Sequence, residues 1–188
     1  CVFILAADDI DAVLPTIRSR SRLLRVGVPS KEDALAWLSA QKRLKGDPEV
    51  ALAMAGGAPL NAVKDITGLT LDAKASATLR DLLARGRSLT PDSIVRGYSA
   101  SMGIPAVALH LSRWCYDLLR VKSGADPHFF IREKDVLEKI AADATMKNLL
   151  SLNAAVAEMR RSAEHPLAPR QVWEGVLLVY VRALGGQV

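Results

Sequence analysis

The sequence contains only two cysteines, Cys1 and Cys115, and they lie too far apart in the chain to form a disulfide framework or a metal-ligand motif. This usage favours a reducing compartment, so we expect a cytoplasmic protein with Cys115 in its core.

The three histidines, His110, His128 and His165, are isolated from one another and from cysteines or paired carboxylates at ligand spacing. We therefore expect surface or capping roles for them, and no metal site. Because the chain begins with Cys rather than Met, we expect a fragment or a processed product.

Long apolar runs are also missing. The longest, VLLVYV at residues 176–181, is far shorter than the roughly 18 residues that a membrane-spanning helix needs, so we expect no membrane anchor.

The chain also lacks a Gly-x-x-x-x-Gly-Lys-Ser/Thr loop, whose backbone amides would cradle the phosphates of a nucleotide. It therefore cannot work by itself as an ATPase of that type, and we expect no cofactor. Without such a loop, the opening VFILAADD is better interpreted as a strand ending in an acidic turn than as a Mg²⁺ site.

Aromatic residues make up only 5% of the chain, whereas Ala and Leu are abundant, and this composition favours helices. We expect an all-α protein with one exception near its start. There VFILAA, rich in β-branched residues, predicts a short buried strand, and RLLRVGVP predicts an extended segment. The chain then divides into residues 1–28 with this strand and loop, residues 29–67 with three short helices, and residues 68–188 with five or six longer helices.

Capping residues mark the starts of the short helices. Ser30, followed three residues later by an acid, predicts the first N-terminus, and Asp47 before a proline predicts the second. The third begins near Pro59 and is predicted to run through Val63 and Ile66.

Apolar stripes mark the longer helices, which we expect over residues 71–85, from residue 90, from residue 104, over residues 145–163 and from residue 169. Two of them show apolar residues at spacings of one, three and four, as one face of a helix does. The two stripes are Ile104, Val107, Ala108, Leu111, Trp114, Cys115, Leu118 and Leu119, and Leu149, Leu152, Val156 and Met159. Both helices are predicted to face a core.

The formal net charge is +5 and the pI is near 9.4, which is compatible with nucleic acid or an acidic partner and demands neither. The segment LPTIRSRSR places Arg18, Arg20 and Arg22 at every second position, with Ser19 and Ser21 between them. In an extended segment the three arginines would form a ladder on one side. Such a ladder is either a solvated basic edge or a group from which one guanidinium reaches a phosphate.

The stretch FILAADDIDAVLPTIRSRSRLLRV resembles the end of the AAA+ core in clamp-loader subunits of DNA replication, where a Ser-Arg-Cys motif follows Leu-Pro-Thr-Ile-x. Here the motif is Ser19, Arg20 and Ser21, with serine in place of the cysteine. PSKEDALAWL and PEVALAMAGGAPLNAV are similar to the three-helix lid of that family, and the remainder, ending HPLAPRQVWEGVLLVYV, resembles its helical collar. The resemblance covers the whole chain and is greatest to the delta-prime group of the bacterial DNA polymerase III clamp loader.

Two departures from the ATP-binding members point to that group. Those members carry an arginine in a Gly-x-x-Arg pattern of the lid, where this chain has Leu60. They also carry a Thr or Asn that senses the γ-phosphate at the end of the core strand, where this chain has Ala7. Both replacements remove polar contacts to a nucleotide, and delta-prime subunits are similar in not hydrolysing ATP.

The resemblance implies a remnant of the AAA+ core over residues 1–28, a lid over 29–67 and an oligomerising collar over 68–188. It implies partners: the gamma/tau ATPase subunits, the delta subunit and, through the complex, the sliding clamp and primed DNA. Arg20 would be an arginine finger that reaches the ATP of a neighbouring subunit in trans, and Arg18 and Arg22 would give support or face DNA. No intrinsic activity is expected for the chain, which would belong to the DNA polymerase III holoenzyme, a DNA-directed DNA polymerase.

Two alternatives stay open at this point. The chain could be the C-terminal part of an ATPase subunit, gamma or tau, although Leu60 argues against this. It could also be a basic helical module that binds nucleic acid, in which case its binding would depend steeply on salt because phosphate contacts release counterions.

Overall fold

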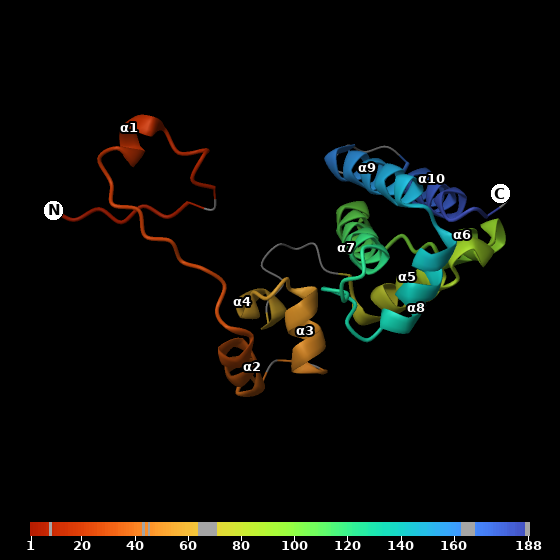
Figure 1. Cartoon of the computed structure of the whole chain (residues 1–188), viewed down its shortest axis with the longest axis horizontal. Helices are drawn as coiled ribbons and strands as arrows, with labels where there is room; N and C mark the ends of the chain where they lie inside the picture. The colour runs from red at the N-terminus through yellow and green to blue at the C-terminus, as the bar shows by residue number, and fades with distance from the viewer. Residues whose placement is uncertain (8, 43, 45, 64–70, 163–167, 187–188) are drawn as a thin grey trace.

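The computed structural model describes residues 1–7, 9–42, 44, 46–63, 71–162 and 168–186, and within these ranges every regular element is a helix (Figure 1). The elements in chain order are α1 Pro15–Arg18, α2 Lys31–Ser39, α3 Pro48–Met54, α4 Pro59–Val63, α5 Ala73–Ala84, the 3-10 turn η1 Gly86–Ser88, α6 Pro91–Gly97, α7 Ile104–Lys122, α8 Lys134–Asp143, α9 Met146–Ser162 and α10 Pro169–Ala183. The prediction of an all-α protein is confirmed for this part of the chain. Within it, no helix combines the length and the apolar character needed to cross a membrane.

The strand predicted near the start of the chain is wrong. The described residues before Pro29 form a long loop with one helical turn, α1, and this loop extends away from the other helices (Figure 1). The side chains of Val2 and Ile4 are 92% and 93% exposed. A strand needs a neighbour that takes up its backbone N–H and C=O groups, and no described segment lies beside this one as a strand. Its β-branched composition alone therefore does not produce a strand.

Helices α2, α3 and α4 contact one another and share a small apolar cluster, which we call the α2–α4 unit. The predicted caps are confirmed: the Ser30 hydroxyl oxygen accepts a hydrogen bond from the N–H of Asp33 at 3.1 Å, and Asp47 accepts one from the N–H of Glu49 at 2.9 Å. Helix α4 ends at Val63, and the predicted extension to Ile66 lies outside the described residues. The buried members of the cluster are Ala34, Leu38 and Leu52.

Helices α5 to α10 enclose a much larger core, which we call the body. Helix α7 contacts α8, α9 and α10, and both predicted stripes face this core. Three large side chains at its centre are joined by hydrogen bonds. Trp114 Nε1 donates to Tyr180 Oη at 3.2 Å, Tyr180 Oη donates to the carbonyl of Leu83 at 2.7 Å, and Trp173 Nε1 donates to the carbonyl of Ile94 at 2.8 Å. These bonds tie α5, α6, α7 and α10 together without leaving the indole and phenol groups unpaired.

Two helices of the body differ from the sequence prediction. Helix α8 was not located in advance, although Leu137, Ile140 and Ala141 give it a buried face. For helix α6, Gly103 in the sequence predicts the end, but the helix ends at Gly97, because Tyr98 already has an extended backbone with ψ of 134°.

The α2–α4 unit meets the body through a few specific contacts. Arg132, in the loop before α8, donates a hydrogen bond to Asp47 at 2.7 Å and lies 3.7 Å from Glu49, both at the N-terminus of α3. Met54 packs against the larger core from the same helix. The position of α3 on the body therefore depends on an exposed ion-pair network and a small apolar contact.

Candidate functional site

The arginine motif lies on a helical turn. Pro15 occupies the first position of α1, where its fixed φ suits a helix and its missing N–H is not needed. The N–H of Arg18 donates to the carbonyl of Leu14 at 3.1 Å, and the N–H of Ser19 donates to the carbonyl of Pro15 at 2.9 Å. The turn begins because this proline favours it, and it continues past α1 through Ser19.

The ladder predicted for Arg18, Arg20 and Arg22 is therefore wrong. The N–H of Arg20 donates to the carbonyl of Ile17 at 3.2 Å, and the N–H of Ser21 donates to the carbonyl of Arg18 at 3.2 Å, so the turn includes both residues. Residues two apart on a helical turn point to nearly opposite sides, because each residue rotates the chain by about 100°. The turn thus separates Arg20 from Arg18.

The three arginines also differ in their partners. Arg18 forms an exposed ion pair with Asp11, with 3.3 Å between Nη1 and Oδ1. The side chains of Arg20 and Arg22 are exposed, and neither forms a hydrogen bond or ion pair with any residue in the described ranges. Arg20 therefore presents a planar fork of donors that an external anion can reach.

The two positions expected to contact a nucleotide lie on different parts of the chain. Ala7 is exposed in the N-terminal loop, and Leu60 lies on α4 with 60% of its surface exposed. Neither side chain can donate or accept a hydrogen bond. The structure does not bring Ala7, Leu60 and Arg20 together into one polar pocket.

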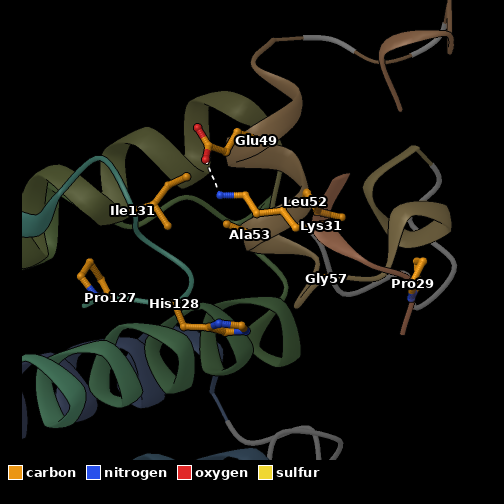
Figure 2. Close-up of a pocket in the computed structure, with 9 residues that line it drawn as sticks. All are labelled: Pro29, Lys31, Glu49, Leu52, Ala53, Gly57, Pro127, His128 and Ile131. Carbon is orange, nitrogen blue, oxygen red and sulfur yellow. Dashed lines mark hydrogen bonds and ion pairs between the residues drawn. The ribbon is translucent and has the colours of Figure 1, made fainter. Parts of the chain in front are cut away.

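A pocket of about 290 Å³ lies where the α2–α4 unit meets the body. Figure 2 shows Lys31 and Glu49 on one side of it, joined by an ion pair of 2.6 Å, and His128 on the other side. The rest of its lining is mostly apolar: Pro29, Leu52, Ala53, Gly57, Pro127 and Ile131. The pocket thus offers one paired cation and one imidazole in an apolar setting.

A buried carboxylate next to this pocket was not identified from the sequence. Asp117, on α7, is 0% exposed. Its Oδ1 accepts the N–H of His128 at 2.7 Å, and its Oδ2 accepts the N–H groups of Phe129 and Phe130 at 2.9 and 2.7 Å. Three consecutive amides of the loop between α7 and α8 are thus held by one side chain. The sequence did contain a signal for this role. Asp117 lies directly beside the apolar stripe that includes Trp114, and a lone carboxylate on a core-facing surface must find buried donors.

The remaining candidate residues show no reactive arrangement. Cys115 is buried, as predicted, and burial raises the pKa of its thiol to about 12. His110 is only 4% exposed, so the predicted surface role is wrong for it. Burial, and then the charges of Arg113 and Arg80, lower the pKa of His110 to about 4, and its Nε2 has no hydrogen-bond partner. This imidazole is therefore neutral at pH 7.

The other two histidines do not add a site. His128 is exposed, as predicted, and His165 lies outside the described residues. In the part of the chain that the structure describes, no three His, Cys, Asp or Glu residues gather as metal ligands would.

Comparison with models of known protein families gives no match, and a search of curated proteins finds no significantly similar sequence.

Proposed function

We propose that this chain is the C-terminal part of a non-ATPase, delta-prime-type subunit of a DNA polymerase III clamp loader. Residues 1–28 would be the end of an AAA+ core, residues 29–67 the lid and residues 68–188 the collar that assembles with gamma/tau and delta subunits. The order of elements supports this proposal, since a turn with the Ser-Arg-Ser motif is followed by a three-helix unit and then by the larger body. Together with those subunits it would load the sliding clamp on primed DNA in the cytoplasm.

The observation that carries the proposal is the state of Arg20. Its guanidinium is exposed on a turn and forms no ion pair with a described residue, whereas Arg18 on the same turn is paired with Asp11. An arginine finger must leave its own subunit and reach a phosphate of its neighbour, where it neutralises charge that develops during ATP hydrolysis. A guanidinium already paired with its own chain would first have to give up that partner.

The test uses the full-length subunit reconstituted with its ATPase and delta partners. Arg20→Ala should assemble normally and lower DNA-dependent ATP hydrolysis and clamp loading by roughly tenfold or more, since arginine fingers contribute up to about 10³ to 10⁵ in rate. Arg25→Ala is the matched control, because it removes an exposed arginine of the same segment to which no role is assigned. Unchanged turnover in the Arg20 variant, or an equal loss in the Arg25 variant, would contradict the assignment.

The same reconstitution addresses the ATPase alternative. A gamma or tau subunit would bind ATP through its own lid, where Leu60 provides no donor for a phosphate. ATP binding by the isolated full-length subunit would favour gamma or tau over the delta-prime type.

A further inference from the structure

A group of aromatic rings lies on the body beside the pocket at the junction with the α2–α4 unit, which we call the junction pocket. Tyr116 and His128 are exposed and Phe129 is half-buried against the core; we call these three rings the Tyr116 platform. Ring centroids are 6.2 Å apart for Tyr116 and His128, 5.7 Å for Tyr116 and Phe129, and 4.7 Å for His128 and Phe129. Tyr116 is 44% exposed. In a chain with 5% aromatic residues, a surface cluster of this kind needs an explanation, because four other aromatic side chains, Trp114, Phe130, Trp173 and Tyr180, are buried in the core.

The backbone that carries the platform is fixed by the buried side chain of Asp117. Two of its members, His128 and Phe129, donate their backbone N–H groups to the buried carboxylate of Asp117, at 2.7 and 2.9 Å. Tyr116 precedes Asp117 on α7, so one helix positions all three rings. Burying a carboxylate is unfavourable unless donors surround it, and here those donors belong to the loop that carries His128 and Phe129. Rings fixed in this way lose little conformational entropy when they bind a ligand.

Positive charge accompanies the rings. The guanidinium carbon of Arg120 lies 5.8 Å from the centre of the Tyr116 ring, and that of Arg113 lies 5.5 Å from the centre of the Phe129 ring. His128 also lines the junction pocket, where Lys31 lies across from it (Figure 2). The carboxylate in the lining of that pocket, Glu49, is already paired with Lys31.

We propose that the Tyr116 platform binds single-stranded nucleic acid. An unpaired base stacks against the exposed ring of Tyr116, and Arg113 and Arg120 attract the phosphates that flank it. Rings beside cationic side chains are what sequence-tolerant binding of single strands requires, since every base has a π-face and every nucleotide a phosphate. The two guanidinium groups favour this polyanion over an apolar peptide. The proposal goes beyond the arginine-finger role and does not depend on it, because Arg20 lies outside the platform.

The first test measures binding of a fluorescein-labelled oligothymidylate to the full chain by fluorescence anisotropy at low salt. Tyr116→Ala should raise the Kd by roughly 5- to 150-fold, the range expected for loss of one base–aromatic stack, whereas Tyr116→Phe should bind like the unmodified protein. Arg120→Gln should weaken binding and lower the slope of log K against log salt by about 1.

The matched controls lie away from the platform. Trp37→Ala removes an exposed ring on α2, and Arg182→Gln removes an exposed charge on α10. Arg20→Ala tests whether binding is separate from the proposed finger. All three should bind the oligonucleotide like the unmodified protein, with circular dichroism confirming that every variant is folded.

An abasic oligomer of the same length distinguishes stacking from charge. The unmodified protein should bind it about as weakly as Tyr116→Ala binds oligothymidylate. Three results would overturn the proposal: no binding, equal affinity for the abasic and base-containing oligomers, or equal losses in the platform and control variants. Displacement of the oligonucleotide by polyglutamate at the same charge concentration would also overturn it, in favour of an acidic protein partner.

Discussion

Replacing Asp117 tests whether one buried carboxylate fixes the loop between α7 and α8. In Asp117→Asn the side chain keeps its size, and its amide oxygen can still accept the N–H groups of Phe129 and Phe130. The new NH₂ group then faces the N–H of His128, so a 2.7 Å hydrogen bond becomes a contact between two donors. The substitution therefore changes one interaction and leaves the packing nearly unchanged.

The magnitude follows from this geometry. A hydrogen bond to a charged group contributes about 1.5–3 kcal/mol, and an unpaired buried donor costs about 1–3 kcal/mol. We expect Asp117→Asn to lower the free energy of unfolding by about 2–4 kcal/mol, which corresponds to a fall in Tm of roughly 4–16 °C for a protein of this size. Asp117→Ala should be worse, because it leaves the N–H groups of His128, Phe129 and Phe130 unpaired.

Two measurements check the prediction. Urea unfolding gives the loss of stability. Relative to the unmodified protein, hydrogen exchange in Asp117→Asn should be accelerated more at the amides of residues 128–130 than at core amides of α10. Asp126→Asn is the control, because it removes an exposed carboxylate from the same loop and should leave both measurements unchanged. If the amides of residues 128–130 keep their protection in Asp117→Asn, the carboxylate does not hold the loop and the reasoning fails.

Three further predictions concern the core and the junction. Because burial lowers the pKa of His110 from 6.5 to about 4, the unfolded chain binds more protons than the folded chain between these values. The contribution of neutral His110 to the free energy of unfolding is therefore fully present above pH 6.5 and falls by roughly 3 kcal/mol towards pH 4. Urea unfolding of His110→Leu should show a correspondingly shallower dependence of stability on pH. Tyr180→Phe removes the acceptor for Trp114 and the phenol's own donated bond, and it should lower the free energy of urea unfolding by about 1–3 kcal/mol without changing the helical circular dichroism. Arg132→Asp should loosen the α2–α4 unit from the body, measured as a broader distance distribution between spin labels on α2 and α8, whereas Arg132→Lys, which keeps the positive charge, should broaden it less; an unchanged distribution in Arg132→Asp would show that this ion pair does not hold the junction.

The helices of this protein could be predicted where local chemistry decides the backbone. Ser30 and Asp47 cap their helices as expected because each cap involves a hydrogen bond within three residues. The stripe through Leu111, Trp114 and Leu118 predicted α7 because one apolar face repeats along a long helix. Helix α8 was missed because its buried face is short and lies between charged residues.

The N-terminal segment shows where local patterns fail. The alternation of Arg18, Arg20 and Arg22 predicted a strand-like ladder, but alternation specifies a strand only when a neighbouring strand is present. Pro15 decides the outcome here, since its backbone favours a helical turn that needs no partner. Arg20 is exposed because this turn lies away from the other helices (Figure 1).

Contacts between distant segments could not be predicted from this sequence. The bonds from Asp117 to residues 128–130 cross a loop, and the pair of Arg132 with Asp47 joins positions 85 residues apart. Each depends on the arrangement of whole helices, which no short pattern encodes. The unexpected polar contacts therefore lie at the loop and at the junction.

The contacts at the junction determine how the segment that carries Arg20 is attached to the body. The chain passes from that segment into α2 at Ser30, and Pro29 already lines the junction pocket. Helix α2 packs on α3, whose N-terminus is bound by Arg132 of the body. A rotation of the α2–α4 unit on the body must therefore move the arginine turn's point of attachment, because that turn is joined to the unit through the N-terminus of α2. Loss of the Arg132 pair should change where Arg20 can reach while leaving its own turn, closed by bonds from Leu14 to Ser21, intact.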